Sequence, residues 1–113
     1  MHEFSLAQSL VEQVTELVVR EGANRVTRIE VSIGAMSGVM KDPFEFCFPE
    51  AAKGSCLEGC ELSVHEVPLT VACLDCGAKS SPENFDIRCS VCKCRNVTII
   101  EGKDFLLNSV EVD

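Results

Sequence analysis

Residues 73–92 have the sequence CLDCGAKSSPENFDIRCSVC. Cys73 and Cys76 form one Cys-x-x-Cys pair, and Cys89 and Cys92 form a second. This spacing lets both sulfurs of a pair reach one ion, while the amides that follow can donate hydrogen bonds to the thiolates. The pattern predicts a zinc ribbon that holds one structural Zn(II) ion through four thiolates, with no open position for a catalytic water.

The same cysteines also fit three roles besides zinc binding. Iron in a rubredoxin-like site has the same preference for four thiolates. The residues could also be ordinary buried cysteines or a redox pair. Lys93 stands where such a turn usually has glycine, and Cys94 follows it, so Cys94 is an alternative to Cys92 as fourth ligand. The two-residue spacing favours Cys92.

The composition is that of a small globular protein. The chain has 113 residues, of which 46% are hydrophobic and 25% are charged, and its net charge is −8. A negative field opposes approach to phosphate backbones, so we expect no nucleic-acid partner. No apolar run approaches the roughly 20 residues that span a bilayer, so we expect no membrane partner either.

The eight cysteines would suit a disulfide framework only in an oxidising compartment. The N-terminus shows neither the basic segment nor the apolar stretch of a secretory signal, so we expect a cytoplasmic protein with reduced thiols. Three further cysteines, Cys47, Cys56 and Cys60, are not spaced like metal ligands, and we assign them no function. A dithiol redox role stays open for Cys56 and Cys60, because helical spacing could bring them together.

Two segments have the pattern of amphipathic helices. Between Ser5 and Glu21, apolar residues recur at three- and four-residue steps, with a capping box at Ser5 and Gln8 and a left-handed cap at Gly22. A second helix is expected to open with three capping residues and to bury four others: Asp42, Pro43 and Glu45, then Phe44, Cys47, Phe48 and Ala51. Pro49 predicts a kink or an early end there.

Alternating residues predict the strands, with Ile29, Val31 and Ile33 on one buried face and His65 on a wet face. Further strands are expected around residues 62–64, 69–73, 97–100 and 105–112. The last strand has little to pack against in a zinc ribbon, whereas the N-terminal sheet would gain a partner. We therefore predict an α+β domain of residues 1–68 plus 103–113, with a small mixed sheet and two helices, and an inserted zinc-ribbon domain of residues 69–102.

The chain begins Met1-His2-Glu3. A free amine, peptide nitrogens and the His2 imidazole lie in one chelating unit, and nitrogen-rich planar sites suit Ni(II) or Cu(II). A histidine at position two is also a common accident of a solvated terminus.

Together these features resemble the HypA/HybF family of nickel metallochaperones for [NiFe]-hydrogenase maturation. The resemblance rests on Met1-His2-Glu3 before a helix, Ile33-Gly34-Ala35-Met36-Ser37-Gly38-Val39, Gly59-Cys60-Glu61-Leu62, two cysteine pairs and a terminal strand. It covers essentially the whole chain in order. It implies a nickel-binding α+β domain that carries the zinc module as an insertion.

The resemblance also implies the ligands and partners. Nickel would be held by the Met1 amine, the His2 imidazole and amide, and the Glu3 amide, and zinc by the four paired cysteines. The implied partners are a hydrogenase large subunit and a nickel-linked GTPase, with urease maturation as a further role, and the chain as a monomer or homodimer. Some relatives have an acidic residue where this chain has Met40, with Asp42 two residues later.

Rival functions are a zinc-ribbon interaction module without nickel transfer and a thiol redox switch. No nucleotide-binding loop, HExxH helix or nucleophile elbow is present in the sequence, so we do not expect an enzyme.

Overall fold

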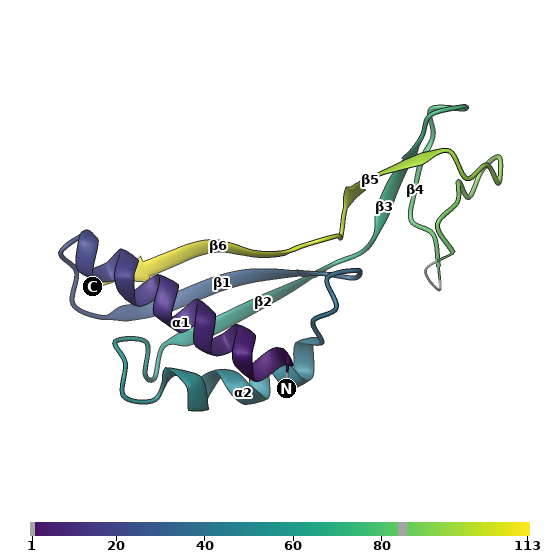
Figure 1. The fold of residues 1–113 in the computed structure, drawn as a ribbon. Helices are drawn as coiled ribbons and strands as arrows, with labels where there is room; N and C mark the ends of the chain where they lie inside the picture. The colour runs from purple at the N-terminus through teal and green to yellow at the C-terminus, as the bar shows by residue number, and fades with distance from the viewer. Residues whose placement is uncertain (1, 84–85) are drawn as a thin grey trace.

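The computed structural model describes residues 2–83 and 86–113. Along this part of the chain the elements are α1 (His2–Arg20), β1 (Val26–Gly34), α2 (Lys41–Ala52), β2 (Glu61–Val67), β3 (Thr70–Cys73), β4 (Lys79–Ser80), β5 (Val97–Glu101) and β6 (Phe105–Val112). The predicted α+β class is confirmed. The molecule is elongated, 52 × 28 × 17 Å, with the helices at one end and the cysteine-rich turns at the other (Figure 1). Neither helix in the described ranges is long and apolar enough to cross a membrane.

The first sheet has the order β2-β1-β6, and β1 pairs in parallel with β2 and in antiparallel with β6. Parallel pairing of β1 and β2 needs a crossover, which α2 supplies. The last strand of the chain thus returns to the N-terminal sheet. This return was predicted because a zinc ribbon offers that strand little surface to pack against. The second sheet, with the order β4-β3-β5, is antiparallel throughout.

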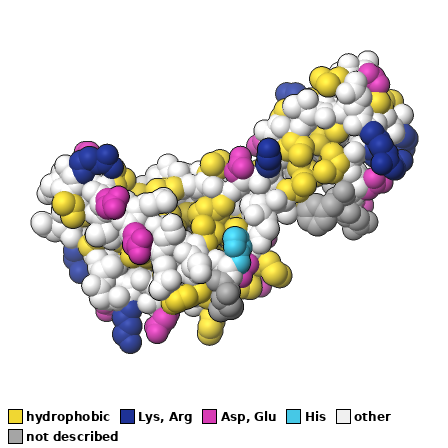
Figure 2. Space-filling view, viewed as in Figure 1, with side chains coloured by type: hydrophobic (Ala, Val, Ile, Leu, Met, Phe, Trp, Pro, Cys, Tyr) yellow, Lys and Arg dark blue, Asp and Glu magenta, His cyan; other side chains and the backbone are white. Residues whose placement is uncertain are grey.

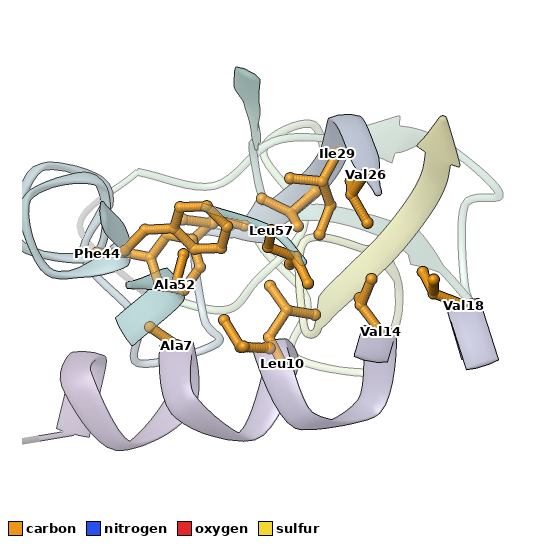
Figure 3. Close-up of a cluster of buried hydrophobic side chains, with 13 residues drawn as sticks. Ala7, Leu10, Val14, Val18, Val26, Ile29, Phe44, Ala52 and Leu57 are labelled. Carbon is orange, nitrogen blue, oxygen red and sulfur yellow. The ribbon is translucent and has the colours of Figure 1, made fainter. Parts of the chain in front are cut away.

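Both helices pack on one face of the first sheet, where they enclose a core of small and aliphatic side chains with Phe44 at one end (Figure 3). The predicted inner face of β1 is confirmed, because Ile29, Val31 and Ile33 are all buried. Leu57, in the turn after α2, is fully buried as well. Phe105 of β6 meets Phe44 edge-on at 5.2 Å between ring centroids, which links the last strand to the core.

The first helix begins earlier than predicted, at His2, so Ser5 lies inside the helix and the expected capping box at Ser5 and Gln8 is wrong. The helix extends because its first turn has a tertiary anchor: the Glu3 carboxylate accepts a hydrogen bond from the Met40 amide at 3.3 Å. The end is as predicted. Gly22 has φ +71°, and the Ala23 amide donates to the Val18 carbonyl at 3.0 Å, the bond of a Schellman cap.

The second helix also begins earlier than its sequence suggests. Met40 is its N-cap and makes no side-chain cap bond, so the expected cap at Asp42 is wrong. Asp42 lies in the first turn, where its negative charge interacts favourably with the positive end of the helix dipole. Pro49 does not stop the helix, which ends one turn later. Ala52 is fully buried, because residues at four-residue steps from Phe44 face the core, whereas the predicted Ala51 is only half-buried against it.

The face of the first sheet opposite the helices is polar. Arg28 donates to Glu30 at 2.8 Å, to Glu111 at 3.0 Å and to Glu61 at 3.3 Å. His65 is exposed, as predicted, with its Nε2 2.9 Å from Glu30. Hydrogen bonds from His65 and then Arg28 hold the pKa of Glu30 below its usual value.

The two sheets meet where the backbone segments around Gly34, Pro68 and Gly102 cross. These segments are too close together to leave room for side chains at the two glycines. The Gly34 amide donates to Asp104, and the Met36 amide donates to Gly102 at 2.8 Å. A Cβ atom on Gly102, whose φ is +90°, would lie 2.5 Å from the Pro68 carbonyl oxygen. The crossing is therefore a close-packed backbone junction.

We expect Gly102→Ala to lower the free energy of unfolding by more than Gly54→Ala. Both glycines have positive φ, which costs an alanine about 1–2 kcal/mol, but only Gly102 faces backbone atoms, since nothing lies within 4 Å of a Cβ at Gly54. Urea denaturation followed by circular dichroism measures both. Equal losses would show that the junction has room for a methyl group.

Candidate metal sites

The first cysteine pair is a tight turn at the end of β3. The Cys73 amide donates to the Ala78 carbonyl at 2.9 Å, and the Gly77 amide donates to the Cys73 carbonyl at 3.0 Å. Gly77 has φ +76°, a conformation that costs glycine little. Inside the turn, the Cys76 amide donates to the Cys73 sulfur at 3.3 Å. The backbone thus directs one donor onto a thiolate.

The second pair repeats this geometry. The Cys89 amide donates to the Cys94 carbonyl at 2.8 Å, and the Lys93 amide donates to the Cys89 carbonyl at 2.9 Å. The amides of Val91 and Cys92 donate to the Cys89 sulfur at 3.3 and 3.4 Å. Lys93 occupies the position that glycine has in the first turn, and its φ is +65°. This position therefore adopts the left-handed conformation in both turns, which explains why glycine is usual there.

The structure brings the four predicted cysteines into one group. Sγ atoms of Cys73 and Cys92 are 3.6 Å apart, as are those of Cys76 and Cys89, and all four lie within 4.8 Å of one another. Cys73 and Cys89 are buried, whereas Cys76 and Cys92 are exposed. A set of four sulfurs at these separations can surround one soft ion tetrahedrally.

Hydrogen bonding makes the buried sulfur of each pair acidic. The Cys92 amide, assisted by that of Val91, lowers the pKa of Cys89 to about 6. The Cys76 amide lowers the pKa of Cys73 in the same way. The Ala78 amide lowers the pKa of Cys76, but hydrogen bonds with neighbouring thiols and burial outweigh it and raise this pKa to about 12. A cation is therefore needed to hold all four groups as thiolates, and its binding releases protons.

Cys94 is held outside this group by Asp75. Its thiol donates to the Asp75 carboxylate at 2.7 Å, and the Asn96 side chain donates to the other carboxylate oxygen at 3.2 Å. The bond to Asp75 raises the pKa of Cys94. Of the two candidates for fourth ligand, only Cys92 belongs to the cluster. No local pattern points to Asp75, since only the folding of both turns brings it beside Cys94.

The remaining cysteines lie in the helical half of the molecule. All eight cysteines fall in the described ranges and are free thiols. Cys47 is buried, the Cys56 sulfur lies 3.9 Å from the Thr15 hydroxyl, and burial raises the pKa of Cys60. None of the three joins the four-sulfur group.

Of the predicted nickel ligands, His2 and Glu3 lie at the start of α1, far from the cysteine-rich turns (Figure 1). Met1 is outside the described residues. His2 is exposed and Glu3 is half-buried in the first helical turn. Amides at the start of a helix have no intrahelical acceptor, so the His2 and Glu3 nitrogens are not committed to the helix.

Met40 lies beside this terminus, on the face of the molecule whose surface Figure 2 shows. Through its amide, Met40 is bonded to the Glu3 carboxylate, and its side chain is 64% exposed. No sequence motif predicts this contact, which joins residues far apart in the chain. Together with Lys41, Met40 and Asp42 line a hollow of about 660 Å³ that extends to Glu66 and Pro68.

Comparison with known proteins agrees with this architecture. The family model described as hydrogenase/urease nickel incorporation, metallochaperone, hypA matches residues 1–112. The chain belongs to the HypA family. It is 34% identical to the hydrogenase maturation factor HypA of Chlorobium limicola, covering 100% of this chain and 97% of that protein, and 36% identical to the Aquifex aeolicus factor, covering 100% and 98%.

Solved structures of the family share the fold. The solution structure of the Ni metallochaperone HypA from Helicobacter pylori is 26% identical, with a TM-score of 0.69 over 97% of this chain and 96% of that one. A solution structure of a HypA protein is 29% identical, with a TM-score of 0.72 over 99% and 96%. The family resemblance is confirmed, and the HypA family consists of metallochaperones rather than enzymes, as expected for this chain.

If the four-sulfur group holds a metal ion, we expect Cys92→Ser to lose that ion and Cys94→Ser to retain it. Only Cys92 is in the four-sulfur group, whereas Cys94 is bonded to Asp75. Metal content of the purified proteins, measured by plasma mass spectrometry, tests the difference. Loss of metal from Cys94→Ser alone would assign the fourth ligand to Cys94.

Proposed function

We propose that this chain carries Ni(II) to a [NiFe]-hydrogenase large subunit during maturation of that enzyme. The observation that carries the proposal is the exposed His2 in the first turn of α1 of a HypA-family chain. Nickel is the cargo, held by the Met1 amine, the His2 imidazole and amide, and the Glu3 amide. Nitrogen ligands of this kind suit Ni(II).

The exposure of this terminus supports a carrier rather than a storage site. A carrier must release its ion, and ligands on an exposed first turn can be displaced one at a time by those of an acceptor. The Glu3 carboxylate is engaged by the Met40 amide, so its contribution to nickel comes from the backbone nitrogen. Met40 offers no carboxylate, and Asp42 in the first turn of α2 is the nearest acidic residue along that segment.

The four cysteines hold a structural Zn(II) ion in this proposal. Four thiolates fill a tetrahedral shell and leave no position for exchange, so this ion stays with the protein. Residues 69–102 form the zinc-ribbon domain, inserted into a nickel-binding domain of residues 1–68 plus 103–113. A module this small has little core of its own, which is why the ion stabilises it.

The partners follow from the same function. A hydrogenase large subunit accepts the nickel, and a nickel-linked maturation GTPase acts with this chain, with urease as a further client. These reactions take place in the cytoplasm, where the thiols stay reduced.

Nickel titration of three proteins tests the carrier proposal. Wild type is expected to bind one Ni(II), whereas His2→Ala and a variant with Gly-Ser added before Met1 are expected to lose at least about tenfold in affinity, because each removes one nitrogen ligand from the chelate. Isothermal titration calorimetry on zinc-loaded protein measures the affinities.

The matched control is His65→Ala, which removes the other histidine, on the polar face of the sheet. It is expected to bind nickel like wild type, and all variants are expected to keep their zinc. Equal nickel binding by wild type, His2→Ala and the extended variant would contradict the N-terminal site. It would then favour an interaction module without nickel transfer.

A further inference from the structure

Helix α2 carries an exposed aromatic residue on its outer side. Phe44 and Phe48 are buried in the core, whereas Phe46 is 85% exposed. Asp42 and Glu50, four residues before and after it, are also exposed and lie on the same side of the helix. Aromatic side chains are enriched in the centres of protein interfaces, where a few of them carry most of the binding energy. The outer side of α2 is therefore a candidate docking surface.

Met40 continues this surface toward the nickel terminus. It directly precedes α2, its side chain is 64% exposed, and its amide is bonded to the Glu3 carboxylate at 3.3 Å. Phe46 follows six positions later, which corresponds to roughly 9 Å along a helix. Figure 2 shows hydrophobic side chains at the surface around the start of α1. The exposed apolar residues of this segment thus begin beside the proposed nickel ligands.

The hollow of about 660 Å³ adjoins the same segment. Asp42 and Glu66 line it together with Lys41. The Lys41 ammonium is 3.8 Å from the Glu45 carboxylate one turn further along α2, so the charges of these two residues offset each other. Within the described ranges, Asp42 and Glu66 make no ion pair. The hollow therefore has two exposed carboxylates that can receive a cationic side chain.

The position of this surface limits what can occupy it. A carrier passes its ion on by ligand exchange, so ligands of the acceptor must reach the nickel while it is still bound near His2. A specific interface buries about 800 Å² on each partner, which a short terminus cannot supply alone. The acceptor must therefore extend onto neighbouring residues, and Met40 at the start of α2 is such a neighbour, because it is bonded to Glu3.

We propose that the nickel acceptor docks on the surface formed by Met40, Asp42, Phe46, Glu50 and Glu66, which we call the α2 face. The inference rests on the proposed carrier function and adds where the acceptor binds and by which chemistry. The matching segment of the acceptor places an apolar side chain against Phe46 and Met40, and a lysine or arginine in the hollow, toward the carboxylates of Asp42 and Glu66. A methionine suits such a contact because its unbranched side chain adapts to the partner's shape.

Charge favours a basic acceptor segment. The chain has a net charge of −8, which attracts cationic segments over a long range. Complementary charges mainly raise the rate of association, whereas a desolvated apolar anchor such as Phe46 mainly slows dissociation. Salt screens the first contribution and leaves the second, so the two can be measured separately.

Binding to a nickel-free [NiFe]-hydrogenase large subunit, measured by biolayer interferometry with the zinc- and nickel-loaded chain, tests the proposal. Phe46→Ser is expected to raise the dissociation constant at least about tenfold, because it removes the apolar anchor. The matched control is Val19→Ser, which removes a 73% exposed apolar residue on α1 and is expected to bind like wild type. Equal effects of the two variants overturn the proposal, and so does a wild-type chain that does not bind the large subunit.

Charge reversal tests the acidic part of the α2 face. Glu66→Lys is expected to slow association at least about threefold at low salt, and this difference is expected to shrink at high salt. Glu16→Lys changes the net charge equally at an exposed position of α1 and is expected to slow association less. Equal slowing by both variants would show that net charge alone matters, which overturns the role of the hollow.

Nickel titration without the acceptor separates this inference from the carrier proposal. Phe46→Ser and Glu66→Lys are expected to bind Ni(II) like wild type, since neither residue is a ligand of the N-terminal site. Nickel binding at His2 together with unchanged acceptor binding by Phe46→Ser contradicts the docking surface alone, whereas absence of an N-terminal nickel site contradicts the carrier function. If Phe46→Ser weakens binding of a maturation GTPase and not of the large subunit, the α2 face belongs to the GTPase and the proposal is overturned.

Discussion

Pairing between β1 and β6 is the interaction on which the rest of this molecule depends. It returns residues 105–112 to a strand that forms near the start of the chain, and it adds Phe105 to the core against Phe44. Because the chain must come back to β1, the cysteine-rich segment is confined between two connections that cross at Gly34 and Gly102. The backbone at this crossing is hydrogen-bonded and leaves no space for a side chain, so it fixes where the second sheet starts.

Two separate parts of the molecule offer different chemistry toward metals. At one end, amides of two matching turns point at the sulfurs of Cys73 and Cys89, which lowers the pKa of both thiols. Such a site is closed and suits an ion that stays. At the start of α1, away from the cysteines, His2 is exposed on a first helical turn whose amides have no intrahelical acceptors, which suits an ion that must leave.

Local patterns predicted the elements better than their boundaries. The alternation of Ile29, Val31 and Ile33 indicated the buried face of β1, and Gly22 indicated the end of α1. Both helix starts were wrong, for one reason: Glu3 and Met40 hold each other through a hydrogen bond between distant segments, and no capping pattern encodes it. The bulge at Asn108 was not predicted either, because it depends on how β6 fits against β1.

The sequence by itself determined the α+β class, the return of the last strand to the N-terminal sheet and the four cysteines of one cluster. It could do so because apolar periodicity and two-residue spacing act over short stretches of backbone. Only the tertiary structure placed Cys92, and not Cys94, in this cluster, since the difference depends on Asp75, which is brought beside Cys94 by the folding of both turns. It alone placed Met40 beside Glu3 and left the edge of β6 free, because such contacts depend on chain segments that meet only in the folded state.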